Sequence, residues 1–419
     1  MHESMDPDLP PEIRAKLAEL DAFIEREIKP LEQRHMQFFD QRREYARTDW
    51  EKDGQPRQEW NDLMAEMERL ADRAGHLRYS LPVEHGGQAA SNLAVAAIRE
   101  HLAAKGLGLH NDLQDESSVV GNFPLVPILH AYGTPEQKKY IEGIVGRRNH
   151  LAFALTEPDH GSDATWLETT ARREGDSWII NGRKRFNSQV YRAGANLVFA
   201  RTSGESGDAA GITAFIVPMS TPGMEILYNH WTFNMPSDHP EVGLKDVRVP
   251  HSAILHAEGQ GLIVAQRFVH ENRIRQAAAS AGAARYCIGE AVKYAKSRKV
   301  FGSSLARQQA VQFQLAELHA ECELVRHFIF KVARQMDRQD PLQISDRVSI
   351  CNFRANRLVC EAADRAMQVH GGMGYTRALP FEHIYRHHRR YRITEGSEEI
   401  QIRRVAQYLF GFGAGARRD

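Results

Sequence analysis

The chain has 419 residues, which is enough for two or three domains and a large buried core. Apolar residues make up 42% and charged residues 26%, and 54 lysines and arginines balance 54 aspartates and glutamates. This composition is typical of a globular protein. The zero net charge argues against a general nucleic-acid-binding protein, because such proteins usually carry a basic excess.

The N-terminus and the cysteines indicate a cytoplasmic protein rather than a secreted or membrane protein. Residues 1–11 are acidic and proline-rich without an apolar segment, and the chain contains no run of about eighteen apolar residues. The cysteines form no C-x-x-C pair. We therefore expect all of them to be buried and reduced, at positions Cys287, Cys322, Cys351 and Cys360.

Residues 1–150 are expected to form an N-terminal helical domain. Near its start, apolar residues recur at the spacing of one helix face, at Ile13, Leu17, Leu20, Phe23, Ile24 and Ile28. Thr134, Pro135 and Gln137 have the order typical of a helix start. They supply a hydroxyl cap, a proline in the first turn and a glutamine three residues after the cap.

Residues 151–258 are expected to form a β domain, because short β-prone runs replace the helical periodicity. These runs cover residues 177–180, 197–200, 212–218, 224–228 and 242–249. Asn181 and Gly182 predict a hairpin turn between two strands, since both residue types accept a positive φ. Strands at this close spacing favour a small sandwich or barrel.

Residues 259–419 are expected to form a C-terminal helical bundle. Within residues 308–338 one apolar stripe consists of Val311, Leu315, Leu318, Cys322, Val325, Phe328, Ile329 and Val332. A second long helix is predicted over residues 345–370, ended by Gly371 and Gly372. The fold class is therefore α+β, with helices, a β domain and further helices in chain order.

The loop at residues 155–163 is the strongest candidate ligand site, with the sequence Leu-Thr-Glu-Pro-Asp-His-Gly-Ser-Asp. It combines two hydroxyls, a proline, a glycine and three acids between two apolar runs. A packed core requires none of these. Such a loop is suited to presenting backbone N–H groups and hydroxyls to a polar ligand.

A second candidate is the segment Thr-Glu-Gly-Ser-Glu-Glu at residues 394–399. A carboxylate in such a turn beside an apolar pocket is desolvated, which favours proton uptake, and Glu395 is then suited to act as a general base. The alternative is a helix N-terminus whose acids only face the helix dipole. Taken alone, the segment favours that alternative.

Two further segments are weak signals on their own. Residues 368–374 read Gln-Val-His-Gly-Gly-Met-Gly, which suits either a helix C-cap or a main chain lying against a cofactor. Arg298 begins the sequence Arg-Lys-Val-Phe-Gly, with Gln309 shortly after it. An arginine there suits a phosphate contact, and a solvated helix end is the alternative.

His383, His387 and His388 raise the question of a metal site, since the first two lie one helical turn apart. Four arginines surround them and would repel a cation, and no third ligand of suitable type is evident. We therefore expect no metal at this segment. An anion contact or a subunit-interface face is the preferred interpretation.

Together these segments resemble the acyl-CoA dehydrogenase family over nearly the whole chain. Five motifs occur in the family order, namely the Thr-Glu-Pro-x-x-Gly-Ser-Asp flavin loop at 156–163, Lys-Arg-Phe-Asn-Ser at 184–188, Arg-x-x-Phe-Gly at 298–302, the block at 368–372 and Glu-Gly-Ser at 395–397. The family fold has an N-terminal helical domain, a middle β domain, described above as a sandwich or barrel, and a C-terminal four-helix bundle.

The resemblance implies an FAD site at a subunit interface of a homotetramer. One subunit would contact the flavin ring and the phosphates through Thr156, Gly161, Ser162, Phe186 and Ser188. A neighbouring subunit would reach the adenosine half through Arg298, Phe301, Gln309, Gln368, Gly371 and Gly372. The site would be closed by Gly396, Ser397 and Glu399.

The resemblance also implies the oxidation of an acyl-CoA thioester to the α,β-enoyl-CoA. Glu395 would remove the α-proton, the β-hydrogen would leave as hydride to flavin N5, and an electron-transferring flavoprotein would accept the electrons. Glu398 and Glu399 are the nearest rivals for the base, and Glu157 is expected to shape the loop. The substrate side would include Ser162, Asp238, Arg273 and Glu395, with Arg273 anchoring either the catalytic region or the ligand.

Some positions depart from the common family pattern. Phe186 stands where many relatives have Trp, Ser188 replaces Thr, Trp166 replaces a small residue and Glu399 replaces Gln. The substrate-side sequence Asp-His-Pro at 238–240 also differs, so the acyl group need not be a plain fatty chain.

Two alternatives on the same fold stay open. One is a flavin oxidase or monooxygenase, against which a retained Glu395 favours dehydrogenation. The other is a nucleic-acid-binding protein, against which the zero net charge argues. Fold analogy alone does not establish an activity.

Overall fold

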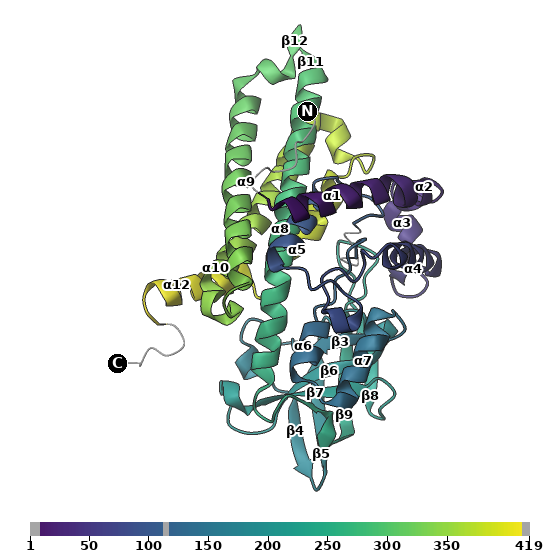
Figure 1. Cartoon of the computed structure of the whole chain (residues 1–419), viewed down its shortest axis with the longest axis vertical. Coiled ribbons are helices and arrows are strands. Elements are labelled where there is room, and N and C mark those ends of the chain that lie inside the picture. Colours follow the sequence, from purple (N-terminus) through teal and green to yellow (C-terminus); the bar gives the residue numbers. More distant parts are fainter. Residues whose placement is uncertain (1–8, 112–116, 413–419) are drawn as a thin grey trace.

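The computed structural model describes residues 9–111 and 117–412. Residues 1–8 lie outside this part of the chain. They make up most of the N-terminal segment in which no signal peptide is expected from the sequence. Helices, a β-sheet and further helices follow one another along the sequence, and the sheet lies at one end of the long C-terminal helices (Figure 1). This is the α+β order that the sequence predicts.

The N-terminal region is built mainly from helices. Its α-helices are α1 Pro11–Phe23, α2 Lys29–Gln33, α3 Arg43–Arg47, α4 Gln58–Arg73, α5 Asn92–Ala103, α6 Val126–Tyr132 and α7 Pro135–Val145. It also contains the π-helical turn η1 Ile24–Ile28, the short turns η2 Met36–Phe38 and η3 Val83–His85, and the strands β1 Thr48–Asp49 and β2 Gln55–Pro56. The predicted apolar stripe is confirmed, because all of its residues are buried along α1 and η1.

The predicted start of α7 is confirmed and also connects two regions. The Thr134 hydroxyl accepts a bond of 3.3 Å from the Gln137 backbone N–H, and the Gln137 side chain accepts one of 3.0 Å from Thr134 N–H. The Gln137 amide group also donates to the backbone carbonyls of Ser252 and Ile254, at 3.0 and 2.9 Å. The capping residue therefore ties the helical region to the edge of the sheet.

The middle region forms one eight-stranded sheet. Its strands are β3 His150–Ala154, β4 Thr170–Glu174, β5 Ser177–Lys184, β6 Ala193–Arg201, β7 Ile212–Pro218, β8 Met224–Asn229, β9 Pro240–Pro250 and β10 Ile254–Leu255. The order across the sheet is β10-β7-β6-β4-β5-β9-β8, and β3 pairs in parallel with β6. Each predicted β run lies within one of the strands β5 to β9.

The central strand β6 shows why this region forms a sheet. Leu197 and Phe199 belong to the large core that the sheet shares with the helices. Val198 and Ala200 alternate with them and belong to a second core, enclosed by the sheet itself. Alternate side chains of a strand point to opposite faces, so both faces of β6 are buried.

The hairpin predicted at Asn181 and Gly182 is wrong. Both residues lie inside β5, where the pairing with β9 shifts register between Ile180 and Gly182. Gly182 has φ 155, and a Cβ there would lie 2.7 Å from the Thr169 Cα, so the glycine permits a close approach of two backbones. The actual turn joins β4 to β5 at Gly175, which has φ 59.

The C-terminal region is dominated by long helices. They are α8 Gly261–Ser297, α9 Gln309–Met336, α10 Ser345–His370, α11 Phe381–Arg390 and α12 Glu398–Leu409. A short hairpin of β11 Lys299–Val300 and β12 Ser303–Ser304 joins α8 to α9. Helix α10 has the predicted bounds, and Gly371 ends it with φ 59.

Helix α8 is the axis of the bundle and packs against α5, α9 and α10. Its contact with α5 depends on Gly282, because a Cβ there would lie 2.1 Å from the backbone oxygen of Glu100. Ala278, one helical turn earlier on the same face of α8, is also small and buried. Small side chains therefore let α5 approach α8 closely.

The four cysteines are free and buried, as the sequence predicts. Burial raises the pKa of each of these thiols, so they remain protonated near neutral pH. Across residues 9–111 and 117–412, every helix is too short or too polar to span a bilayer.

The interpretation of the α11 histidines as an anion contact or a subunit-interface face is wrong. The exposed fractions of His383, His387 and His388 are 2%, 1% and 0%. His388 Nδ1 lies 2.9 Å from the Ser280 hydroxyl on α8, and His387 Nε2 lies 3.0 Å from the Tyr391 hydroxyl. Burial lowers the pKa of all three rings, which keeps them neutral inside the core.

Candidate active site

The loop at residues 155–163 is held in shape by a buried ion pair. The Glu157 carboxylate accepts a bond of 2.7 Å from Lys184 Nζ and two from the backbone N–H groups of Glu168 and Thr169, at 2.5 and 2.9 Å. Lys184 is 0% exposed and also donates to the Leu155 carbonyl at 3.2 Å. The role predicted for Glu157 as a loop-shaping residue fits this geometry.

Charges on both partners are maintained despite their burial. Desolvation lowers the pKa of Lys184 to about 8, which still leaves the ammonium protonated at neutral pH. Burial alone would raise the pKa of Glu157, but the charge and hydrogen bonds of Lys184 outweigh it and lower the pKa. The pair leaves Thr156 half-buried and Gly161 and Ser162 exposed, so the outer side of the loop is accessible to a ligand.

The segment after β5 lies beside this loop. The Arg185 backbone N–H donates to the Thr156 carbonyl at 2.9 Å, which brings Thr156 next to residues 186–188. Phe186 has φ 60 and is 51% exposed, an unusual arrangement for a bulky residue in a well-packed region. The Ser188 hydroxyl is exposed and lies 2.8 Å from His239 Nδ1.

Asp238 lies against the same segment. Its carboxylate accepts a bond of 3.1 Å from the Gln189 backbone N–H, and its other oxygen lies 3.2 Å from His239 Nδ1. The structure thus brings together four of the residues predicted for the flavin and substrate sides: Thr156, Phe186, Ser188 and Asp238.

Glu395 lies in a left-handed turn before α12. Glu395 has φ 57 and Gly396 has φ 85. Arg273 on α8 holds this turn, donating from Nε and Nη2 to the Glu395 carbonyl at 2.9 and 2.6 Å and from Nη1 to the Ser349 hydroxyl at 3.3 Å. A non-glycine residue in this conformation is costly, and such strain is typical of functional sites.

Arg273 therefore anchors the turn, one of the two roles that the sequence left open. Its side chain is buried, and burial lowers its pKa to about 10, so it stays charged at neutral pH. The Gln401 amide adds a bond of 2.7 Å to the Gly396 carbonyl. The backbone oxygens of Glu395 and Gly396 are thus both fixed by buried side chains, one from α8 and one from α12.

The Glu395 carboxylate faces the part of α8 that touches the β domain. Asn272 Nδ2 donates to Glu395 Oε1 at 3.3 Å. Phe268, one helical turn earlier on the same face of α8, stacks on Phe153 of β3, with ring centroids 4.1 Å apart and planes at 7°. Phe153 lies just before Thr156 in the chain, so the strand that leads into the candidate flavin loop packs on the same face of α8 as the Glu395 carboxylate.

Glu398 is committed to an ion pair and is a poor candidate for the base. Arg392 donates to both of its carboxylate oxygens at 2.9 Å, and Arg357 donates at 3.1 Å. The hydrogen bonds from Arg392 lower the pKa of Glu398 to about 2. Glu399 is exposed in the first turn of α12. Among the three acids, Glu395 is the one that faces the junction of the two domains.

We expect Glu398→Gln to destabilise the protein by roughly 2–3 kcal/mol at pH 7, because lowering the pKa from 4.5 to about 2 corresponds to about 3.4 kcal/mol before the screening by solvent is discounted. Because the folded pKa is lowered, the contribution is present above the ordinary value of 4.5 and is lost as the pH falls toward 2. Urea unfolding of both proteins at several pH values measures it. A difference that is independent of pH from 7 to below 4 would contradict the ion-pair explanation.

The residues predicted for the adenosine half lie elsewhere, at the far end of α8. Arg298 follows the last turn of α8, about 38 Å beyond Arg273 at a rise of about 1.5 Å per residue. The β11–β12 hairpin projects from that end, opposite to the sheet (Figure 1), and Phe301 at its tip is fully exposed. The Tyr294 ring packs at a tilt against His370 at the end of α10, with ring centroids 4.3 Å apart.

That contact gathers the second group of predicted residues at one end of the bundle. Its members are all exposed and comprise Arg298, Phe301, Gln309, Gln368, Gly371 and Gly372. Within one chain, this group lies at the end of α8 away from the sheet, whereas the loop at residues 155–163 follows β3 of the sheet (Figure 1).

Three residues at the site were given no role from the sequence. The pairing of Lys184 could have been predicted in kind, because a lysine that is buried at the end of a strand requires a buried acid as its partner. Glu241, 0% exposed, accepts bonds of 2.9 Å from Arg185 and from the Tyr228 hydroxyl. Asn272 donates a hydrogen bond to Glu395, which lies 123 positions later in the sequence, and no local pattern predicts that contact.

Family models for acyl-CoA dehydrogenases match almost the whole chain. The N-terminal domain model matches residues 25–146, the middle domain model residues 152–247 and the C-terminal domain model residues 259–410. The three matches follow the order of the helical, β and helical regions described above.

Relatives and solved structures agree with these matches. A 3-(aryl)acrylate reductase from Clostridium sporogenes is 35% identical, over 80% of this chain and 87% of the relative. The human mitochondrial short-chain specific acyl-CoA dehydrogenase is 33% identical, over 80% of each chain. A glutaryl-coenzyme A dehydrogenase solved with glutaryl-CoA superposes with a TM-score of 0.80 at 26% identity, covering 99% of this chain and 98% of that one. The chain belongs to the acyl-CoA dehydrogenase family and is an oxidoreductase of that FAD-dependent class.

Proposed function

We propose that the protein oxidises an acyl-CoA thioester to its α,β-enoyl-CoA, with Glu395 as the base that removes the α-proton. The observation that carries this proposal is the position of the Glu395 carboxylate. A strained turn, fixed by Arg273, holds it against Asn272 of α8, one helical turn from the contact of Phe268 with the β domain. A general base is effective only when its carboxylate is held in a fixed position relative to the proton that it removes.

The residues at the junction fit FAD as the cofactor. The loop at 155–163 presents hydroxyl and backbone donors on its outer side, and the half-exposed ring of Phe186 offers an apolar face beside them. These are the donor types that an isoalloxazine ring and a diphosphate need. When bound, the flavin supplies the hydride acceptor for the β-carbon. The chain itself supplies the base, the loop contacts and exclusion of water.

Each of these tasks is assigned to particular residues. Glu395 takes the α-proton, Asn272 orients its carboxylate, and Arg273 fixes the backbone that carries it. The buried Glu157–Lys184 pair keeps the loop in its ligand-ready shape. Asp238 and Ser162, both near the candidate flavin surface, remain the proposed contacts to the substrate. Gly396, Ser397 and Glu399 remain the proposed contacts that close the cofactor site.

We further propose that the cofactor site is completed by a neighbouring subunit in a homotetramer. Arg298 and Phe301 lie at the opposite end of α8 from Thr156, so one chain cannot bring both to one FAD molecule (Figure 1). An exposed hairpin with a fully exposed phenylalanine at its tip suits insertion into a partner. Gln309, Gln368, Gly371 and Gly372 would accompany it.

Arg298→Ala is expected to lower FAD affinity by about 2 kcal/mol, the usual value for a charge-assisted hydrogen bond. Absorbance of the bound flavin against protein concentration measures the loss. Lys296→Ala, two residues earlier on the same exposed helix end, is the matched control and should retain its FAD. Full FAD occupancy in a protein that light scattering shows to be monomeric would contradict the shared site.

The electron acceptor distinguishes the proposal from a flavin oxidase. Substrate-reduced enzyme is mixed in one arm with air-saturated buffer and in the other with an electron-transferring flavoprotein under nitrogen. We expect slow reoxidation by oxygen and fast reoxidation by the flavoprotein. The reverse order of rates would favour the oxidase.

The acyl group is proposed by class only. One relative is named for a 3-(aryl)acrylate and another for short acyl chains. A panel of thioesters should therefore include short straight chains and 3-arylpropanoyl groups beside longer fatty chains. The departures at Asp238 and His239, which lie beside Ser188, are the positions expected to shape this preference.

A further inference from the structure

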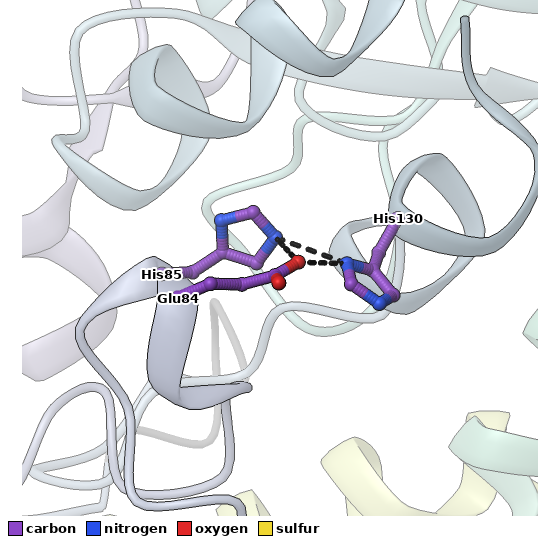
Figure 2. A group of neighbouring side chains, drawn as sticks. All are labelled: Glu84, His85 and His130. Atoms are coloured by element: carbon purple, nitrogen blue, oxygen red, sulfur yellow. Dashed lines mark hydrogen bonds and ion pairs between the residues drawn. The ribbon is translucent and has the colours of Figure 1, made fainter. Parts of the chain in front are cut away.

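A cluster of two histidines and one glutamate lies on the N-terminal region, and none of its residues belongs to the site described above. Glu84 and His85 belong to the turn η3, and His130 belongs to α6 (Figure 2). In residues 9–111 and 117–412, this is the one group of at least three histidine, cysteine or acidic side chains with ligand atoms close enough to share a metal ion.

The three ligand atoms have the mutual spacing that a small divalent ion requires. His85 Nε2 lies 3.3 Å from His130 Nδ1 and 3.5 Å from Glu84 Oε1. Tetrahedral zinc with bonds of about 2.0–2.1 Å places its ligand atoms about 3.3 Å apart. The remaining distance, 2.6 Å from Glu84 Oε1 to His130 Nδ1, is that of a hydrogen bond and must widen by about 0.7 Å for zinc to enter.

The turn that carries two of the ligands is rigid. Its backbone N–H groups at His85 and Gly87 donate to the Pro82 carbonyl at 3.0 and 3.1 Å. Gly86 has φ 77, and a Cβ at Gly87 would lie 1.9 Å from the Leu81 oxygen. The side chains of Glu84 and His85 therefore start from a fixed backbone, which lowers the entropy cost of binding an ion.

The third ligand comes from a helix that is anchored in the core. Ile128 and Leu129 on α6 are fully buried, which fixes the helix and directs His130 to the surface beside η3. The His85 and His130 rings lie edge to face at 87°, and His85 Nε2 and His130 Nδ1 both face Glu84 Oε1 (Figure 2). Glu84 is exposed, and solvent can reach the fourth coordination position.

We propose that Glu84, His85 and His130 bind a divalent transition-metal ion, for which zinc best suits two imidazoles and one carboxylate. The ion joins the η3 turn to α6 and acts as a clamp between segments 45 positions apart in the sequence. Each ligating nitrogen must be unprotonated, so neutral His85 binds through Nε2 and neutral His130 through Nδ1, each with its proton on the other ring nitrogen. The hydrogen bonds among the three side chains are replaced by bonds to the ion.

The test uses the full-length flavin-loaded protein after dialysis against a chelator. Zinc sulfate is titrated in by calorimetry, and the melting temperature is measured at each zinc concentration. We expect one zinc ion per chain and a melting temperature that rises with zinc, because the ion binds only the folded arrangement. An anomalous-scattering peak between the three side chains in zinc-soaked crystals would locate it.

Variants separate the cluster from general histidine binding. His85→Ala and His130→Ala should each weaken zinc binding by at least about ten-fold and abolish the rise in melting temperature. Glu84→Gln should weaken it less, since both imidazoles remain. His327→Ala is the matched control, because His327 on α9 is exposed and has one glutamate, Glu323, at 3.9 Å.

The outcome is decided by stoichiometry and by the variants together. An unchanged flavin spectrum shows that each variant is folded. The proposal is overturned if zinc binds with the same affinity to His85→Ala and His130→Ala as to the wild type. It is equally overturned if no zinc binds below millimolar concentrations, in which case the cluster is a hydrogen-bonded trio only.

Discussion

Glu395→Gln should reduce its flavin with substrate about 10²–10⁴-fold more slowly than the wild type, the range for loss of a general acid–base group. Glutamine keeps the shape of the side chain and can still contact Asn272, but it accepts no proton. The bound thioester should still perturb the flavin spectrum, because the binding contacts remain. Stopped-flow measurement of flavin reduction under nitrogen gives the rate directly.

Glu399→Gln tests the rival acid in the same experiment. Glu399 lies four residues later and is exposed, so its variant can bind FAD less tightly but should reduce the flavin that it holds at close to the normal rate. If Glu395→Gln kept the normal rate and Glu399→Gln lost it, the assignment of the base would be wrong, although the reaction would stand. Equal losses of kcat and kcat/KM would indicate an interaction made in the transition state.

Lys184→Met is expected to cost about 3–5 kcal/mol of unfolding free energy, because it leaves the Glu157 carboxylate buried without its cation. Lys184 is 0% exposed and is 2.7 Å from that carboxylate. The loop at 155–163 should lose its shape as well, so we expect the purified variant to contain less FAD. Urea unfolding and flavin content per chain measure the two effects.

A double-variant cycle tests whether the pair itself is responsible. Glu157→Gln alone should mainly weaken FAD retention. In combination with Lys184→Met it should recover at least about 1 kcal/mol relative to the sum of the single changes, since no uncompensated charge remains. Strict additivity would show that Lys184 acts through packing rather than through Glu157.

The order of helices, sheet and helices follows from the sequence because it depends on local periodicity. The stripe from Ile13 to Ile28, the cap at Thr134 and the end of α10 at Gly371 are all decided within a few residues. The prediction at Asn181 and Gly182 failed because a close contact with Thr169 selected the glycine, and no turn formed there. Tertiary context overrides a turn signal in such cases.

The candidate site was predictable only as a set of separate motifs. The sequence identified Thr156, Phe186 and Glu395 but did not show that Phe153 stacking on Phe268 brings them together. It also missed the buried positions of the α11 histidines, since an arginine-rich segment is usually exposed. The cluster of Glu84, His85 and His130 joins two segments whose ligands have no common local pattern.

The most direct test of the proposed reaction is anaerobic mixing of the purified protein with a panel of acyl-CoA thioesters. The panel contains short straight-chain, long straight-chain and 3-arylpropanoyl groups, and the flavin absorbance is followed after each addition. The proposal predicts that at least one saturated thioester bleaches the flavin and is recovered as its α,β-enoyl-CoA. If every thioester leaves the flavin oxidised while dithionite bleaches it fully, the protein does not carry out this reaction.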